Sequence, residues 1–372
     1  MPKNIVICCD GTANEFAVNI TNVLKLYSVL TYQIGCQITF YHPGLGTMEP
    51  AGALTSFARK TTKLMGMAFG YGLADDIRDA YVFLMKNYEP EDRVFLFGFS
   101  RGAYTVRAVC SLLRLYGLIR KDNESLVPYA TRLLMGIEQS EGDPGAVAQY
   151  FSLADGFRST LATDCKPWFV GVWDTVSSVG WVENPLKLPY ISNNPDIQIG
   201  RHAVSLDERR AFFRTNLWRP PSDSTADYGP RDLKQVWFVG DHCDVGGGYT
   251  EAESGLSKIA LEWMICEAIS AGLQVNHDKV NEVLGRTGAG HASPDPDGKA
   301  HESLRGWWHL AELVPKKHYD WTTARTRRRM NFWRRRPIPP KSLIHESAFF
   351  RKNYKTKLPA DSTRVTTSCT SR

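Results

Sequence analysis

The stretch of residues 94–102 constrains the fold of this chain more than any other part of its sequence. It reads Val-Phe-Leu-Phe-Gly-Phe-Ser-Arg-Gly, and a helix-like segment, residues 103–115, follows directly. This pattern is typical of a nucleophile elbow, a strand–turn–helix that raises a serine hydroxyl above the end of a parallel sheet. Small residues are needed on both sides of the serine because the strand and helix backbones nearly touch there. We therefore predict that Ser100 is a nucleophile, and the alternative is a tight turn with a capping serine.

Strand-like and helix-like runs alternate along the chain. The predicted strands are residues 4–9, 37–42, 94–97, 168–173 and 235–239, and the predicted helices are residues 23–31, 74–85, most of 103–157, and 256–271. Such alternation indicates βαβ units and a mainly parallel central sheet flanked by helices, the α/β class. We predict one α/β-hydrolase-like domain over residues 1–357, with a C-terminal loop or lid insertion at 285–340 and a disordered polar tail at 358–372.

Polar side chains stand where four of these strands end. Asp10 follows the first strand, Ser100 the third, Asp174 the fourth, and His242 comes shortly after the fifth. Chemistry in such sheets gathers at the carboxyl ends of the strands. A serine nucleophile needs a histidine base, and that base needs an orienting acid, in the chain order Ser, Asp, His for α/β-hydrolases. Ser100, Asp174 and His242 follow that order and form the predicted catalytic set.

Two alternatives remain open within this set. His345 follows an apolar pair late in the chain and is the second candidate for the base, in which case Asp244 becomes the more natural acid. An oxyanion hole combines the amide after the nucleophile with one from an early strand–helix loop. Here these are the amide of Arg101 and that of Gly11 or Thr12.

Two other classes of protein fit the same residues. Asp10, Asp174 and Asp244 could gather a hard cation for a metal-assisted hydrolase, with Ser100 as a ligand or nucleophile. A non-catalytic binding protein is the third hypothesis. Neither a metal nor any other cofactor is expected under the preferred serine mechanism.

The charge of the chain is concentrated in one region. The net charge is +6, and residues 316–336 hold much of the excess, including seven arginines between positions 325 and 336, with Phe332 and Trp333 among them. This mixture suits an anionic membrane surface, although a solvated loop is the alternative. The segment 304–321 is aromatic-rich and is predicted to form a lid or substrate wall. Because the rest of the chain is nearly neutral, no nucleic-acid partner is expected.

The cysteines and the N-terminus bear on localisation. Eight cysteines have no zinc-motif spacing and read as reduced thiols rather than a disulfide framework. The apolar run of residues 5–9 is too short for a secretory signal, and no stretch approaches a membrane span. We expect a cytoplasmic protein, or one exported without a cleavable signal peptide.

Six motifs, taken together, resemble a known family. In chain order they are Asp10-Gly11-Thr12-Ala13-Asn14, Pro43-Gly44-Leu45-Gly46-Thr47, Gly98-Phe99-Ser100-Arg101-Gly102-Ala103-Tyr104, Val172-Trp173-Asp174-Thr175-Val176, His242-Cys243-Asp244-Val245-Gly246-Gly247-Gly248-Tyr249 and Ile344-His345-Glu346-Ser347. They resemble the α/β-hydrolase domain family of bacteria and fungi, formerly of unknown function, that includes type VI secretion phospholipase effectors. The likeness covers roughly residues 3–350.

The resemblance implies a Ser–Asp–His hydrolase that acts on ester bonds, with lipids or phospholipids as the expected substrates. It favours Ser100, Asp174 and His242 as the triad. The family commonly has a hydrophobic or small residue where Asp241 stands here, and a serine near Cys243. The additional carboxylate at Asp241 is therefore expected to change the charge of the pocket.

Overall fold

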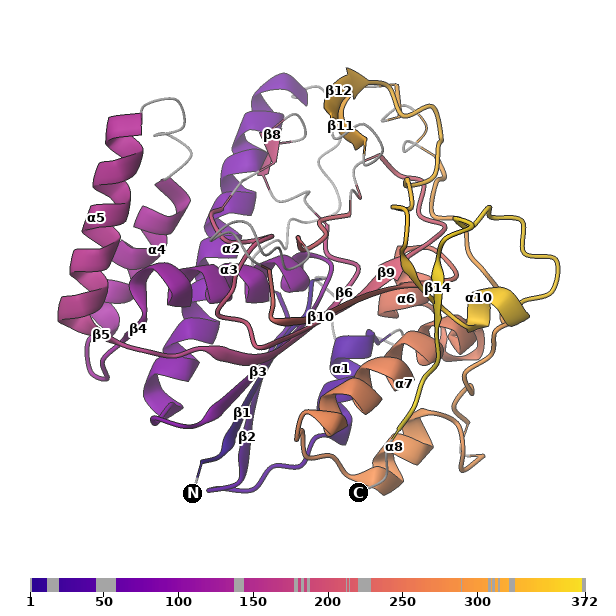
Figure 1. Cartoon of the computed structure of the whole chain (residues 1–372), viewed down its shortest axis with the longest axis horizontal. Coiled ribbons are helices and arrows are strands. Elements are labelled where there is room, and N and C mark those ends of the chain that lie inside the picture. The colour runs from indigo at the N-terminus through magenta and orange to yellow at the C-terminus, as the bar shows by residue number, and fades with distance from the viewer. Residues whose placement is uncertain are drawn as a thin grey trace.

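The computed structural model describes residues 2–11, 20–44, 58–136, 144–176, 180–181, 184–185, 188–211, 213, 215–219, 229–288, 290–306, 309, 312–313, 315–320 and 325–369. For residues 58–71, 180–181, 184–185, 316–320 and 325–327 it describes the backbone. Within these residues, eight strands form one sheet in the order β14-β13-β10-β9-β6-β3-β1-β2 (Figure 1). Every pairing in this sheet is parallel. The predicted α/β-hydrolase-like class, with a mainly parallel sheet flanked by helices, is confirmed.

The strands of the sheet are β1 (Asn4–Cys9), β2 (Gln37–His42), β3 (Arg93–Phe99), β6 (Pro167–Trp173), β9 (Ile199–Ser205), β10 (Asp232–Phe238), β13 (Leu343–His345) and β14 (Thr363–Val365). The inner strands β1, β3 and β6 are buried on both faces, which explains why they read as continuous apolar runs. Ile5 and Ile7 of β1 belong to the core on one face of the sheet, whereas Val6 and Cys8 belong to the core on the other.

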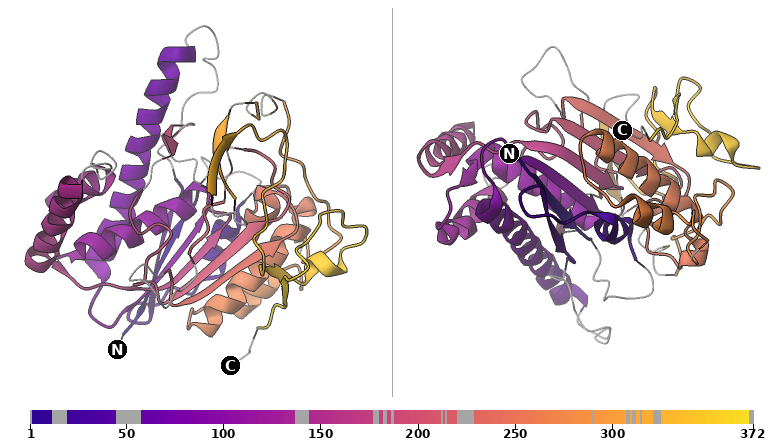
Figure 2. Two further views of the ribbon diagram at one scale, coloured as in Figure 1. Left: turned by 45° about the horizontal axis from the view of Figure 1, so that its top comes forward. Right: turned by 90° about the horizontal axis from the view of Figure 1, so that it is seen from below.

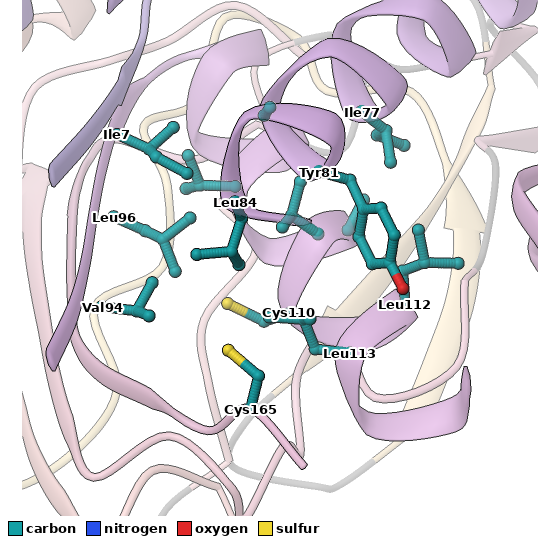
Figure 3. Packing of buried hydrophobic residues seen from close by; sticks show 14 of the residues in the cluster. Ile7, Ile77, Tyr81, Leu84, Val94, Leu96, Cys110, Leu112, Leu113 and Cys165 are labelled. Carbon is teal, nitrogen blue, oxygen red and sulfur yellow. The ribbon is translucent and has the colours of Figure 1, made fainter. Parts of the chain in front are cut away.

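Helices cover both faces of the sheet, as the view from below in Figure 2 shows. One face carries α2 (Ala58–Asn87), α3 (Arg101–Tyr116), α4 (Val127–Gly136) and α5 (Pro144–Leu161). The other carries α1 (Asn22–Val29), α7 (Gly255–Ser270) and α8 (His277–Val283). Figure 3 shows the first of these cores, where Leu84 of α2 and Cys110 of α3 pack beside Leu96 of β3.

The short elements lie around this frame. They are the paired strands β4 (Leu118–Ile119) and β5 (Ala162–Thr163), the pair β7 (Gly180–Trp181) and β8 (Asn184–Pro185), the helices α6 (His242–Gly246) and α10 (Ser347–Phe350), and the 3-10 turns Glu124–Leu126 and Glu251–Glu253. Within the predicted insertion, β11 (Lys316–Asp320) and β12 (Arg325–Arg329) form an antiparallel hairpin, drawn at the top of Figure 1. The predicted aromatic lid, residues 304–321, lies partly outside the described residues.

Three strands of the sheet were absent from the sequence prediction. The strand β9 lies between β6 and β10 and was missed because Arg201 and His202 interrupt its apolar pattern. Both side chains are buried. Arg201 forms ion pairs with Asp232 and Glu267. The other two missed strands, β13 and β14, have three residues each and are too short for a pattern.

The C-terminal segment differs from the prediction in two ways. The expectation of a disordered tail over residues 358–372 is wrong for β14, which pairs with β13 at the edge of the sheet. The expectation of reduced cysteines is wrong for Cys266 and Cys369, which form a disulfide between α7 and this tail. The other six cysteines have free thiols. Among the described helices, none combines the length and the apolar character needed to cross a bilayer.

Candidate active site

Ser100 sits at the turn from β3 into α3, as the elbow pattern predicts. Its backbone has φ 58° and ψ −116°, a strained conformation for a non-glycine residue. The turn is tight: a Cβ at Gly98 would lie 2.4 Å from the carbonyl oxygen of Gly102, and one at Gly102 would lie 2.0 Å from that of Cys9. Glycine is therefore required at both positions that flank the serine.

Asp174 follows the neighbouring strand β6 and is fully buried. The Ser100 amide donates to the carbonyl of Trp173 at 3.1 Å, so the two strand ends lie side by side. The Asp174 carboxylate accepts from the Ser205 amide at 3.0 Å and from His242 Nδ1 at 2.6 Å. Both of its oxygens also accept from Arg336, at 2.5 Å and 3.0 Å. Burial opposes ionisation, but the Arg336 charge and the His242 hydrogen bond outweigh it and hold the pKa of Asp174 well below its ordinary value.

His242 begins the short helix α6 just after β10. Its ring packs between Phe99 and Phe213, with ring centroids 4.6 Å and 4.8 Å away. Phe99 directly precedes Ser100, so the imidazole lies at the elbow. The backbone N–H of His242 points to the buried carboxylate of Glu208 at 3.3 Å, which fixes the start of α6. A base positioned in this way, with Nδ1 bound to a carboxylate, presents Nε2 for proton transfer.

The predicted oxyanion loop follows β1. The Arg101 side chain donates to the carbonyl of Gly11 at 2.8 Å, and a Cβ at Gly11 would lie 2.7 Å from the Arg101 amide nitrogen. This loop therefore touches the elbow. The Gly11 amide, however, donates to Asp10 at 2.8 Å, so it is already engaged, contrary to its predicted role as an oxyanion donor. Thr12, the alternative, lies outside the described residues.

Asp10 stabilises this loop through its hydrogen bonds. Its second carboxylate oxygen accepts hydrogen bonds from the hydroxyls of Thr21 and Tyr41. Burial, reinforced by the charge of Asp10, raises the pKa of Tyr41 above its ordinary value, which keeps the phenol protonated as a donor. Asp10 thus serves the structure of the loop through contacts that the sequence alone did not reveal.

Asp241 and Asp244 form a capping box at the start of α6. The Asp241 carboxylate accepts from the amides of Cys243 and Asp244, and the Asp244 carboxylate accepts from the Asp241 amide. Asp241 also accepts from the Tyr249 hydroxyl at 2.7 Å. Burial, together with the charge of Asp244, raises the pKa of Asp241. The carboxylate that departs from the family pattern is therefore a helix cap.

Asp244 contacts a different histidine from the one that the alternative assignment requires. Its carboxylate accepts from His301 Nδ1 at 2.7 Å and from the His301 amide at 2.9 Å. Tyr249 stacks on the His301 ring at a centroid distance of 3.6 Å. Asp244 is thus bound to its own partners, whereas Asp174 is the carboxylate on His242.

His345, the second candidate for the base, lies on β13. Its Nδ1 is 2.9 Å from the Ser347 hydroxyl and its Nε2 is 2.9 Å from the Thr367 hydroxyl. Its ring stacks on Phe238. Burial lowers its pKa to about 4. These contacts belong to the packing of the C-terminal segment against β10, and they do not include Asp174 or Ser100.

In the structure, the three carboxylates of the metal hypothesis have different hydrogen-bond partners. Asp10 is bound by Thr21 and Tyr41, Asp174 by His242 and Arg336, and Asp244 by His301. The three carboxylates therefore have separate sets of donors. Across the part of the chain that the structure describes, no cluster of three His, Cys, Asp or Glu side chains is placed to hold a metal ion.

Two residues at the site were not found from the sequence. Arg336 was assigned to a surface cluster of arginines, but its side chain is 7% exposed and contacts Asp174. Glu208 follows β9, the strand that was missed, and its buried carboxylate forms an ion pair with Arg210. Arg336 is one of seven arginines between positions 325 and 336, and Glu208 follows a strand that was not predicted. Neither residue therefore belongs to a sequence pattern that indicates its role.

The parallel sheet, the strained serine turn and the Asp–His pair at its carboxyl edge define a protein of the α/β-hydrolase type. Residues 3–267 match the family described as "T6SS, Phospholipase effector Tle1-like, catalytic domain". Because this match covers most of the chain, the protein belongs to the Tle1-like family.

The chain is also similar to individual proteins. A Saccharomyces cerevisiae protein, "Uncharacterized protein YEL023C", is 35% identical over 227 residues, which are 59% of this chain and 33% of the yeast protein. This chain thus spans about a third of that relative. Among solved structures, an uncharacterized protein from Pseudomonas aeruginosa has 20% identity and a TM-score of 0.45, covering 78% of this chain and 49% of that one. The Tle1 effector bound to the VgrG spike has 17% identity and a TM-score of 0.31, with 68% and 52% covered.

Proposed function

We propose that this protein hydrolyses carboxylic ester bonds of lipids through an acyl-enzyme, with Ser100 as the nucleophile. The observation that carries the proposal is the hydrogen bond between His242 and the buried Asp174, beside the strained turn that presents Ser100. The family, whose description names phospholipase effectors, supports a lipid as the substrate. The sequence hypothesis of a serine esterase or lipase is thus carried forward.

The residues suggest the following steps. His242 Nε2 accepts the proton of the Ser100 hydroxyl as the serine oxygen attacks the ester carbonyl, and Asp174 stabilises the resulting imidazolium. The Arg101 amide, together with that of Thr12, would donate to the oxyanion. The imidazolium then gives its proton to the departing alcohol. Water, deprotonated by the same histidine, finally releases the fatty acid and restores Ser100.

We further propose that an exposed patch brings the enzyme to an anionic lipid surface. We call it the aromatic–arginine patch, and it consists of Phe332 and Trp333 with the exposed Arg328, Arg329, Arg334 and Arg335. The two aromatic residues are 49% and 38% exposed, and both have positive φ, 48° and 59°. Aromatic rings beside guanidinium groups suit an interface with one apolar and one charged side.

The decisive experiment is active-site labelling with a fluorophosphonate, combined with hydrolysis assays. Wild type, Ser100→Ala and His242→Gln are compared on a short soluble ester and on phospholipid vesicles. Ser100→Ala should abolish labelling and lower kcat by at least about 1,000-fold. The matched control is Ser159→Ala, the same substitution on the outer face of α5, which should leave both unchanged.

The outcomes separate the hypotheses. Release of fatty acid from vesicles supports a lipid substrate, and hydrolysis of the soluble ester alone restricts the protein to a simpler esterase. Activity that survives Ser100→Ala but is lost with a chelator would indicate the metal-assisted alternative. Neither labelling nor hydrolysis by the wild type would indicate a binding protein.

A further inference from the structure

Asp174 has a second partner that lies far from the rest of the site in the sequence. Arg336 Nη1 and Nη2 each donate to one carboxylate oxygen, at 2.5 Å and 3.0 Å, in the fork geometry of a bidentate pair. The arginine side chain is 7% exposed and the aspartate side chain is fully buried. Buried ion pairs of this geometry are screened very little by solvent.

The guanidinium is itself held in place. Arg336 Nε donates to the carbonyl of Phe213 at 2.8 Å, and the Arg336 amide lies 3.4 Å from the carbonyl of Glu208. Phe213 also packs its ring on His242. One short segment after β9 therefore positions both the imidazole and the arginine that faces its carboxylate.

The charges explain what the arginine can do. A buried Asp174 without a cation would draw a proton onto His242, because an imidazolium would neutralise it. A protonated His242 cannot accept the proton of Ser100. With Arg336 present, the carboxylate already has a counter-ion, held in a bidentate ion pair.

On the basis of the proposed function, we propose that Arg336 is a positioning residue. It fixes the rotamer of Asp174 against His242 and offsets the carboxylate charge, so that the imidazole rests in its proton-accepting form. Arg336 lies outside residues 3–267, which match the family, so this part of the site comes from the C-terminal portion of the chain.

Other charged groups surround the pair, and each is engaged elsewhere. They are His202 on β9, Glu208 and Arg210 after it, Asp241 and Asp244 at α6, and His301. Burial lowers the pKa of His202 to about 3, which makes it neutral near neutral pH. Glu208 is paired with Arg210, and Asp244 with His301. In the described part of the chain, Arg336 is thus the cation that contacts Asp174.

The test compares Arg336→Gln and Arg336→Lys with wild type on a short soluble ester across a range of pH. Arg336→Gln should move the acid limb of the kcat profile to higher pH by about 1 unit, because the imidazolium becomes easier to form. The loss in kcat should be about 10- to 100-fold at acidic pH and smaller at alkaline pH, with KM nearly unchanged. Arg336→Lys keeps the charge but loses the fork, so it should restore the limb and only part of the rate.

The matched control is Arg351→Gln. Arg351 is another partly buried arginine of the C-terminal segment, and it clamps the carbonyls of Pro296 and Gly298 rather than a carboxylate. If Arg336 served stability alone, Arg336→Gln and Arg351→Gln would both lower the midpoint of unfolding and leave the pH profile unchanged. That result would overturn the proposal.

A second readout does not depend on activity. The proton shared by His242 Nδ1 and Asp174 should give a downfield NMR signal, assigned by its loss in His242→Gln. In Arg336→Gln, and less so in Arg336→Lys, it should change position and titrate at higher pH. An inactive wild type whose signal still responds to Arg336 would refute the proposed function and support the role of Arg336. An active enzyme whose signal and pH profile ignore both substitutions would refute the role of Arg336.

Discussion

At the scale of single residues, Asp174 connects segments that lie far apart in the chain. It accepts hydrogen bonds from Ser205, His242 and Arg336, which come from three separate segments. Its own φ is 40°, an unusual value for a non-glycine residue. Such backbone strain persists only where the surroundings determine the conformation, and here the three donors do so.

This connection gives Asp174 an expected role in stability, in addition to the catalytic role proposed above. Asp174→Asn would leave Arg336 buried without its counter-ion, so we expect a loss of about 3–5 kcal/mol in the free energy of unfolding. The double variant Asp174→Asn/Arg336→Gln should recover part of that loss. Urea unfolding of the single and double variants measures the coupling. Additive losses would show that the pair contributes nothing beyond its separate residues.

Stability should also depend on pH through His202. Burial, with the charge of Arg107 added, lowers the pKa of His202 to about 3 in the folded state. Unfolded histidine takes up a proton near pH 6.5, so the unfolded state binds more protons below that pH. The contribution is complete above about pH 6.5 and is lost as pH falls toward the folded value, by up to about 1.4 kcal/mol per pH unit.

The corresponding variant is His202→Gln, which keeps an acceptor for the Thr175 amide that now donates to His202 Nε2. Urea unfolding near neutral pH and at mildly acidic pH should show a smaller difference for this variant than for wild type, by about 2 kcal/mol at pH 5. His277→Gln, an exposed histidine on α8, is the control and should keep the wild-type difference. An unchanged difference in His202→Gln would mean that other groups set the acid sensitivity.

The sequence predicted the site as far as local motifs reach. Asp174 and His242 were proposed because they follow apolar strands, and the structure places them in contact. Arg336 and Glu208 could not be predicted, since their roles depend on which segments the fold brings together. Gly11 was assigned a donor amide that proves to be bound to Asp10, a local contact that no spacing rule reveals.

At the scale of elements, the strand–turn–helix at Ser100 depends on the absence of side chains. Gly102→Ala would place a Cβ 2.0 Å from the carbonyl oxygen of Cys9 on β1. Backbone cannot move away cheaply there, so we expect a loss of at least about 3 kcal/mol, measured by chemical unfolding. Gly156→Ala on α5, where a Cβ meets nothing within 4 Å, should instead be neutral or stabilising. Similar losses in both variants would contradict the close approach.

The aromatic–arginine patch makes a separate prediction. Phe332→Ala/Trp333→Ala should weaken sedimentation with anionic vesicles by about 10-fold or more, because insertion of both rings is lost. Hydrolysis of a short soluble ester should be unaffected. Ile34→Ala, at a residue 83% exposed elsewhere on the surface, is the control. Equal vesicle binding by the double variant and wild type would show that the patch is only a solvated surface.

The strands that the sequence predicted were each found near the predicted position; they are β1, β2, β3, β6 and β10. Of these, β1, β3 and β6 carry the apolar runs that packing on both faces demands. The strand β9 was missed because buried ion pairs, rather than apolar side chains, satisfy Arg201 there. Buried polar residues of this kind become visible only once their partners are known.

At the scale of the whole molecule, the disulfide Cys266–Cys369 joins residues 103 positions apart and fixes the tail beyond β14 to α7. Loss of the cross-link in Cys369→Ser should cost about 2–5 kcal/mol under oxidising conditions, because the unfolded chain gains freedom. A thiol reductant should bring wild type to the level of the variant. Cys36→Ser, at a free cysteine, is the control. A wild type that is insensitive to reductant and equal to Cys369→Ser would contradict the cross-link.

The position of Arg336 also has a consequence for the order of synthesis. A ribosome delivers Ser100, Asp174 and His242 well before the arginine that balances the aspartate. A nascent chain that has folded its first strands would therefore hold a carboxylate whose cation has not yet been translated. On our proposal, its histidine would rest protonated, and the new protein would gain full hydrolytic power only after this late segment had docked.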